Sequence, residues 1–235
     1  YQRSHIKGAI YVGYNDFIVE KTLKVLKVER PIIVYCSIGY RSGKIAEKIA
    51  NAHGFENWKK VKEIAFTFNV DKDTMHFERS WRWNTKSGDV TLISSKDTIS
   101  YNRKHVDSTS INADKGFIND KFWFLAPFQL VWDSGTTISD PVKEESPMSK
   151  TKMNKITLTY INEGGYTPGD AYDFYYEDDF IIREWVFRKG NAKEPTMTTS
   201  WEDYDTFNGL KLAKSHKKPE GNWKLHFTGI TIKTD

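Results

Sequence analysis

The pattern of hydrophobic and polar positions changes near Trp58. Before this point, residues 31–35 form a short apolar run rich in β-branched side chains, which predicts a strand buried on both faces. Residues 41–51 then place apolar side chains at helical spacing, and Gly54 follows the last of them. A strand, a tight loop and a helix in this order are typical of open α/β sheets, which bind ligands at the carboxyl ends of their strands.

After Trp58 the dominant pattern is alternation. Residues 64–70 place large apolar side chains on every second position, and Phe77, Arg79, Trp81 and Trp83 share one face of a second segment, which predicts strands with one buried face. Residues 172–182 have the pattern of a hairpin, and residues 208–209 and 220–222 have the composition of further turns. The chain therefore predicts a run of antiparallel strands.

No long helix is expected after Trp58, and residues 134–154, with two prolines and mixed charge, are expected to form a long exposed loop. The two patterns together predict two units. Residues 1–56 read as an α/β remnant of an open sheet, and residues 57–235 read as an antiparallel, β-rich module with a curved sheet.

The amino-acid composition excludes several classes of protein. Of 235 residues, 14% are aromatic, which is too many for a disordered chain. No apolar run reaches the ~18 residues of a transmembrane helix, and a single cysteine excludes internal disulfides and multi-cysteine zinc sites. The histidines show no metal-ligand spacing, so we expect no metal site among them. The chain opens at Tyr1 without a signal-peptide pattern, so we expect its natural N-terminus to be missing.

The basic charge is concentrated in the first unit. Residues 1–56 carry nine basic and five acidic side chains, which accounts for the whole net charge of +4. So small an excess argues against nucleic acid, whose phosphates need many basic contacts. It suits a pocket for a small anion.

One chemical signal stands out, at the junction between the predicted strand and helix. Cys36 would face the backbone N–H groups of the following loop and the positive end of the helix dipole, which favour a thiolate. Arg41 adds a positive charge, and Gly39 lets the backbone curl inward. The alternative is that Cys36 is an inert buried thiol at the end of a core strand.

The cysteine loop resembles that of rhodanese domains. The resemblance is carried by residues 5–10, by Cys36 with residues 39–42, and by residues 46–57. It covers residues 1 to about 57, so the domain would be truncated. It implies that Cys36 accepts a sulfane sulfur from an anionic, thiosulfate-like donor and passes it on from a persulfide, without a metal or an organic cofactor. His5 is interpreted as structural. The residues implied to hold the persulfide and the donor are Ser37, Ile38, Gly39, Tyr40, Arg41 and Ser42.

A cysteine phosphatase is the rival interpretation of the loop. Phosphatases place an arginine six positions after the cysteine, whereas Arg41 lies five positions after Cys36 and Ser42 takes the sixth. The shorter loop favours sulfur over a phosphoryl group.

The second unit is rich in aromatic residues, which either fill its core or line an apolar concave face that holds a lipid. Residues 66–70, 118–127 and 190–195 resemble a family of secreted bacterial domains that is similar to the LolA-like half-barrel lipoprotein carriers. The resemblance covers about residues 53–235 and implies a lipid or lipoprotein ligand. An acidic stretch is interpreted as a solvated hairpin tip rather than a cation site; it contains Asp170, Asp173, Glu177, Asp178 and Asp179.

Both resemblances include residues 52–58, which indicates a fusion at this shared segment. The first hypothesis is a sulfurtransferase or sulfur carrier that uses Cys36, attached to a module of unknown ligand. The alternative is a non-catalytic protein of the periplasm or cell envelope whose half-barrel binds lipid or lipoprotein, with a vestigial cysteine loop.

Overall fold

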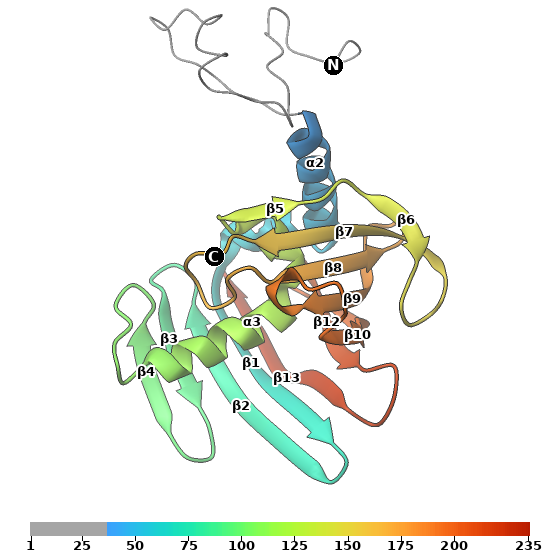
Figure 1. The fold of residues 1–235 in the computed structure, drawn as a ribbon. Helices are drawn as coiled ribbons and strands as arrows, with labels where there is room; N and C mark the ends of the chain where they lie inside the picture. The colour runs from blue at the N-terminus through green and yellow to red at the C-terminus, as the bar shows by residue number, and fades with distance from the viewer. Residues whose placement is uncertain (1–36) are drawn as a thin grey trace, which may run out of the picture.

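The computed structural model describes residues 37–235, with side chains from Ser42 onward, and consists mainly of two antiparallel sheets (Figure 1). The seven-stranded sheet has, in spatial order, β11 (Glu202–Phe207), β12 (Leu210–Lys217), β13 (Lys224–Thr234), β1 (Val61–Lys72), β2 (Met75–Asn84), β3 (Asp89–Ile93) and β4 (Thr98–Asn102). The six-stranded sheet has β10 (Met197–Ser200), β9 (Ile182–Arg188), β8 (Ala171–Tyr176), β7 (Lys152–Tyr160) and β5 (Thr136–Ile138), with β6 (Val142–Glu145) also paired to β7. Both sheets are open, as expected for a curved, half-barrel-like module.

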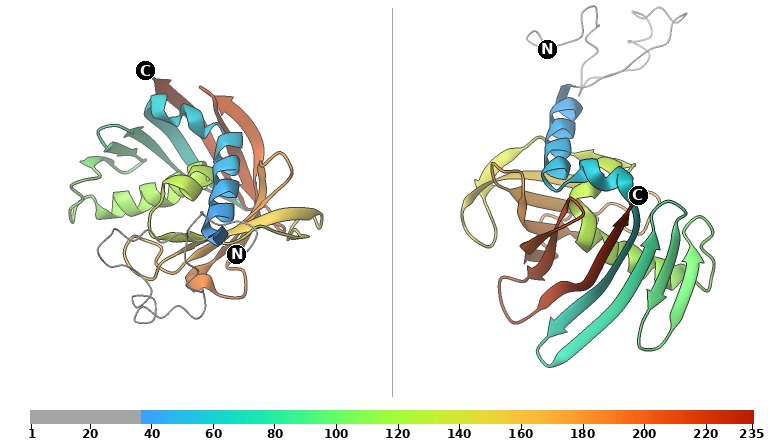
Figure 2. Two further views of the ribbon diagram at one scale, coloured as in Figure 1. Left: turned by 90° about the horizontal axis from the view of Figure 1, so that it is seen from above. Right: turned by 180° about the vertical axis from the view of Figure 1, so that it is seen from behind.

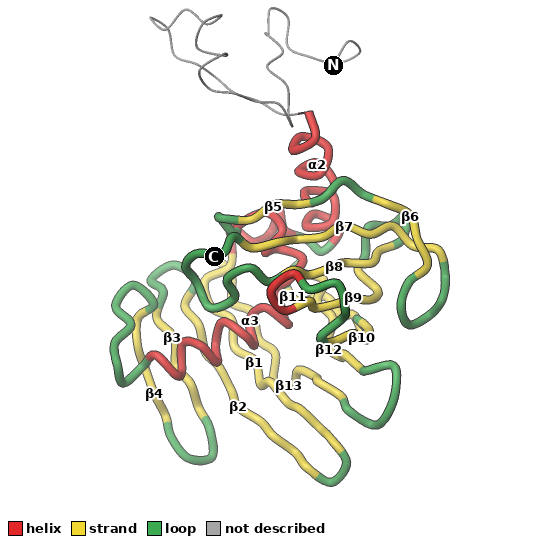
Figure 3. The backbone as a smooth tube through the Cα atoms, in the orientation of Figure 1, coloured by secondary structure: helices red, strands yellow, loops and turns green. Residues whose placement is uncertain are grey.

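Two α-helices and two short 3₁₀ helices complete the described elements: α2 (Ser37–Ala52), η1 (Phe55–Lys60), α3 (Ile111–Trp132) and η2 (Lys189–Asn191). Helix α3 crosses the seven-stranded sheet and ends beside the six-stranded sheet (Figures 1 and 3). No helix in this part of the chain is long and apolar enough to cross a membrane.

The predicted strands are confirmed. In β1, Ile64, Phe66 and Phe68 are buried, as the alternation requires. In β2, Trp81 and Trp83 are buried on the same face. The predicted hairpin is β8–β9, and the two predicted turns join β11 to β12 and β12 to β13.

The expectation that no long helix follows Trp58 was wrong, because α3 has 22 residues. Its apolar side chains surround the helix instead of forming one stripe, and fourteen of its residues are buried. A helix that is hydrophobic all round has no amphipathic signal. The non-helical backbone at Leu125 and the proline at position 127 interrupt it further.

The long exposed loop expected at residues 134–154 was also wrong. This segment contains β5, β6 and the start of β7. The turn between β6 and β7 is fastened by Glu184, a buried carboxylate on β9. Glu184 accepts hydrogen bonds from Ser146 Oγ at 3.1 Å, Met148 N at 2.8 Å and Ser149 N at 2.9 Å. The partner that orders this turn lies far away in the sequence, so local composition does not reveal it.

Helix α2 packs against α3 and β5 (Figure 2). The face predicted to be apolar is buried, since Ala46, Ile49 and Ala50 join the same hydrophobic cluster as the strands and α3. The sequence places these residues in the first unit, whereas in the structure they help to form the core of the β-rich module. Because residues 1–36 lie outside the described part, the division into 1–56 and 57–235 stays a prediction.

The corner after α2 is fixed against the turn between β11 and β12. Gly54 has a φ of 85°, and a Cβ built on it would lie 1.8 Å from the carbonyl oxygen of Gly209. Lys211 N donates to His53 O at 2.9 Å, and Asn57 Nδ2 donates to Gly209 O at 3.3 Å. Only glycine at position 54 permits this close approach.

Candidate functional site

The side chains of the predicted sulfur site lie outside the described residues, except that of Ser42, which is buried. Cys36 is outside them, and α2 begins at Ser37. The backbone of residues 37–42, expected to form a loop before a helix at Arg41, is therefore helical. The roles predicted for Cys36 and for residues 37–42 stay predictions.

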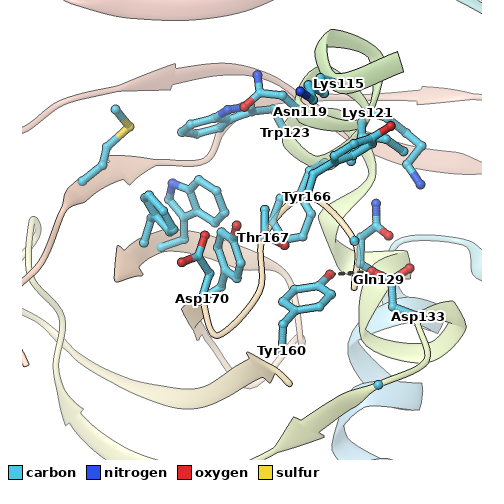
Figure 4. A pocket seen from close by; sticks show the side chains of 18 of the residues that line it. Lys115, Asn119, Lys121, Trp123, Gln129, Asp133, Tyr160, Tyr166, Thr167 and Asp170 are labelled. Atoms are coloured by element: carbon cyan, nitrogen blue, oxygen red, sulfur yellow. Dashed lines mark hydrogen bonds between the residues drawn. The ribbon is translucent and has the colours of Figure 1, made fainter. Parts of the chain in front are cut away.

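A large cavity lies in the described module between α3 and the two sheets (Figure 4). Its volume is about 1060 Å³, at the upper end of the ~300–1,000 Å³ typical of small-molecule sites. Its walls come from α3, from strands of both sheets and from the loop at residues 161–170. The cavity is therefore formed by segments that are far apart in the sequence.

Much of the wall is apolar and only partly covered by protein. Seven half-buried hydrophobic side chains line the cavity: Val70, Ile118, Phe122, Tyr160, Phe187, Met197 and Trp223. Phe122 packs its ring 4.4 Å from that of Tyr172 and 5.7 Å from that of Trp185. Burial of such apolar surface by a ligand contributes roughly 25 cal/mol per Å².

Trp185 adds a polar feature to this wall. Its side chain is 2% exposed, and its Nε1 has no hydrogen-bond partner among the described residues. Trp185 stacks on Tyr172 at a centroid distance of 5.3 Å and meets Trp123 edge-on at 4.4 Å. A buried indole N–H normally finds an acceptor, and this one has none among the described residues.

The only lysine of α3 that is buried also lines the cavity. Lys121 is 8% exposed, and its Nζ lies 5.4 Å from the ring centroid of Trp132 and 6.0 Å from that of Trp83. Burial lowers the pKa of Lys121 to about 8, partly offset by Asp133 and Asp114, while Arg103 lowers it further. No carboxylate of residues 42–235 forms an ion pair with this ammonium.

The loop at residues 161–170 is fastened to the N-terminal part of α3 by Asp114, which is 2% exposed. Asp114 accepts hydrogen bonds from Tyr166 Oη at 2.7 Å, Tyr101 Oη at 3.1 Å and Arg103 Nε at 3.0 Å. Burial and the neighbouring Asp114 carboxylate raise the pKa of Tyr101. One carboxylate thus joins β4, α3 and the loop beside the cavity.

At the other end of α3, Tyr160 Oη donates a hydrogen bond to Asp133 (Figure 4). Burial is the main cause of the raised pKa of Tyr160. Next to this pair, Trp132 Nε1 donates to Gln129 Oε1 at 2.5 Å. The contact between Tyr160 and Asp133 holds the end of the helix against β7, whereas the bond between Trp132 and Gln129 lies within α3.

The acidic stretch departs from its expected role. Asp170 and Asp173 are 8% and 6% exposed rather than solvated. Asp170 accepts from Gly190 N at 2.7 Å, and Asp173 pairs with Arg188 at 2.9 Å. Only residues 177–179 form the exposed hairpin tip. In the part of the chain described, no three His, Cys, Asp or Glu side chains gather closely enough to hold a metal ion.

Sequence reasoning missed Lys121 and Asp114 as site residues, because both lie in the helix that it did not predict. The signal available was a charged residue inside an apolar run, with Lys121 directly before residues 122–128. A charge at such a position is seldom buried without a partner or a function.

Comparison with protein families finds a match to the rhodanese-like domain at residues 1–64. None of the curated proteins compared with the chain matches it. Similar solved structures include a DUF1329 family protein from Desulfovibrio piger, with a TM-score of 0.48 and 6% identity over 84% of this chain and 94% of that chain. They also include a putative outer membrane lipoprotein-sorting protein domain from Vibrio parahaemolyticus, with a TM-score of 0.47 and 7% identity over 83% of this chain and 94% of that chain.

The family match reaches through α2 and η1 into β1, so it overlaps elements that belong to the core of the β-rich module. Residues 1–64 thus match the rhodanese-like domain family, as the cysteine motif predicts, and the chain continues into an open, curved antiparallel module.

Proposed function

We propose that the β-rich module binds the acyl chain of a lipid or lipoprotein in the cavity between α3 and the two sheets. The observation that carries this proposal is a cavity of about 1060 Å³ whose wall contains seven half-buried hydrophobic side chains. An acyl chain would cover apolar surface that the protein itself leaves open. The resemblance of the sequence to secreted bacterial domains supports a place in the periplasm or cell envelope.

Quenching of tryptophan fluorescence tests this proposal. Trp123, Trp185 and Trp223 line the cavity, so a neutral monoacylglycerol with a brominated chain should quench the full-length protein saturably. The unbrominated lipid should compete without quenching. Quenching that rises linearly with lipid concentration and is not relieved by the competitor would contradict the proposal.

Two matched methionine substitutions locate the bound chain. Met197 lines the cavity, whereas Met75, at the end of β2, is 72% exposed. Met197→Arg places a charge on the apolar wall and should weaken binding by about tenfold or more, which corresponds to about 1.4 kcal/mol. Met75→Arg should bind as the unmodified protein does. Equal affinities for the two variants would place the lipid elsewhere.

The family match favours a second function, sulfur transfer by Cys36. In this proposal the Cys36 thiolate attacks the outer sulfur of thiosulfate and a persulfide forms. The S–S bond of the donor breaks, and sulfite leaves with the bonding electron pair. The start of α2 at Ser37 supports the proposal, because the N–H groups of a first helical turn lack intrahelical partners and favour a thiolate beside them. Arg41 would hold the donor, and the free N–H groups of the first turn, at Ser37, Ile38, Gly39 and Tyr40, would face the persulfide, whereas the N–H group of Ser42 lies beyond this turn.

The intact mass after incubation with thiosulfate tests this second function. A gain of one sulfur atom that is absent in Cys36→Ser is expected. An unchanged mass would leave the cysteine segment vestigial and the lipid-binding module as the functional part.

A further inference from the structure

Lys121 differs from the other buried charged groups in residues 42–235. Five carboxylates are buried there, and each accepts at least one hydrogen bond from the protein: Asp114, Asp120, Asp170, Asp173 and Glu184. The ammonium of Lys121 is buried to a similar degree and has only aromatic rings as close partners. Buried charges are ordinarily paired, so this one lacks a counter-ion.

The nearby carboxylates do not fill that role. Asp114 already accepts hydrogen bonds from two tyrosines and Arg103, and Asp133 accepts one from Tyr160. Both act on Lys121 only through space. The one arginine of the cavity wall, Arg103, is itself paired with Asp114 at 3.0 Å. Within residues 42–235, the wall therefore offers an incoming anion a single buried positive charge without an ion pair.

We propose that the ligand of this cavity is a single-chain amphiphile with a carboxylate head, such as a long-chain fatty acid anion, whose carboxylate pairs with Lys121. This inference rests on the proposed lipid-binding function. The acyl chain covers the apolar wall around Phe122 and Met197, and the head group supplies the counter-ion that the protein lacks. A charge-assisted hydrogen bond to a buried ammonium such as that of Lys121 is stronger than the same bond at the surface.

The surroundings of Lys121 favour a carboxylate over a phosphate. A phosphate carries more charge and needs several donors, typically arginine forks. Among the described residues of the wall, Lys121 has the one buried ammonium, Lys115 is exposed to solvent, Arg103 is engaged, and Asp114 and Asp133 repel additional negative charge. A head group with one charge matches this environment.

Competition between ligands of equal chain length tests the inference on the unmodified, full-length protein. Palmitate, hexadecanol and hexadecyl phosphate are each used to displace the neutral brominated monoacylglycerol. Palmitate should bind about tenfold or more tightly than hexadecanol, and more tightly than the phosphate. Equal displacement by palmitate and hexadecanol overturns the inference while leaving the lipid cavity intact. Preference for the phosphate overturns the choice of head group, and failure of the brominated lipid itself to bind overturns the proposed function instead.

Substitutions then assign the preference to one side chain. Lys121→Met keeps the length of the side chain but removes the charge, so the preference for palmitate should disappear while hexadecanol binds as before. Lys121→Arg should retain the preference. Lys96→Met removes an exposed lysine in the turn between β3 and β4, away from the cavity wall, and serves as the control. A preference that survives in Lys121→Met overturns the assignment.

Discussion

One buried residue of the module, Lys121, lowers the stability of the fold. The ammonium of Lys121 is buried without an ion pair among the described residues, and desolvation penalises its charged form. A methionine of similar length would fill the same space without that penalty. This cost to stability favours a role of Lys121 in ligand binding over a role in holding the fold together.

We expect Lys121→Met to stabilise the ligand-free protein at pH 7. The pKa of Lys121 falls from 10.5 in the unfolded chain to about 8 in the folded protein. At 1.36 kcal/mol per unit, the charged form costs the fold about 3 kcal/mol below pH 8. Between pH 8 and 10.5 the unfolded state binds more protons than the folded state, so this penalty disappears as the pH rises.

Urea unfolding at pH 7 and pH 10 measures the effect. The free-energy difference between Lys121→Met and the unmodified protein should be largest at pH 7 and small at pH 10. Lys115→Met should change little at either pH. A Lys121→Met variant less stable than the unmodified protein at pH 7 would show that the lysine is structural.

At the scale of elements, the position of α3 depends on a buried ion pair. Arg79 on β2 donates to both carboxylate oxygens of Asp120 at 2.6 Å, and Trp81 Nε1 adds a third hydrogen bond at 2.7 Å. Burial raises the pKa of Asp120, and the directly paired Arg79 opposes the rise. Gly116 lets Arg79 approach, since a Cβ there would lie 2.8 Å from Arg79 Nη1.

Removal of the Asp120 charge should therefore loosen α3. Asp120→Asn leaves the Arg79 guanidinium without its counter-ion, and breaking a buried pair in this way costs about 3–5 kcal/mol. The control is Asp205→Asn at an exposed pair with Lys214, where a change below about 1 kcal/mol is expected. Chemical unfolding compares the two variants, and equal losses would contradict the role given to Asp120.

The corner after α2 gives a second prediction for an element. Gly54→Ala brings a Cβ to within 1.8 Å of Gly209 O at a positive φ, so the backbone must move. Gly164→Ala, with open space around its Cβ, should lose about 1–3 kcal/mol through its φ alone, and we expect Gly54→Ala to lose more than Gly164→Ala. Thermal unfolding of both variants checks this, and an unchanged Gly54→Ala would show that the contact is not required.

Local sequence patterns predict some of these elements and miss others. The strands with one buried face, such as β1 and β2, follow from alternation because each contains its own signal. Helix α3 is covered on most sides, so its burial depends on two sheets that it contacts only after folding. Strands β5 and β6 are short and gain order from β7 and from Glu184, which no local pattern includes.

The same difference between local and long-range signals decides which parts of the candidate sites can be predicted from the sequence. The cysteine motif lies within a few consecutive residues and is visible in the sequence, although Cys36 lies outside the described part. The cavity is formed by residues from Phe68 to Leu225, and only their arrangement in space brings them together. The sequence predicts a possible apolar concave face from its aromatic residues, but it does not identify Lys121 or Asp114.

At the scale of the whole molecule, two buried histidines join distant parts of the fold. His53, at the end of α2, lies against Tyr204 with ring centroids 5.6 Å apart, and His216 on β12 lies against Trp201 at 4.6 Å. Burial lowers the pKa of His53 to about 4 and that of His216 to about 3. Both are therefore neutral in the folded protein near pH 7.

Mild acid should consequently destabilise the entire module. Below pH 6.5 the unfolded chain protonates these histidines and the folded protein does not, so stability falls with the pH until their folded pKa values are reached. From pH 6.5 to pH 4.5 each histidine removes about 2–3 kcal/mol at 1.36 kcal/mol per unit. Urea unfolding across this range should show the loss, and His53→Gln should reduce its slope. The exposed His76 provides the control, since His76→Gln should leave the loss in place. Constant stability between these pH values would contradict the account.

The central claim is that the space between α3 and the sheets holds an acyl chain. A crystal structure of the full-length protein with the brominated monoacylglycerol tests it most directly, because bromine is located by its anomalous scattering. We predict bromine peaks inside the cavity, in contact with Phe122 and Met197. Peaks confined to the outer surface, with only water in the cavity, would contradict the claim.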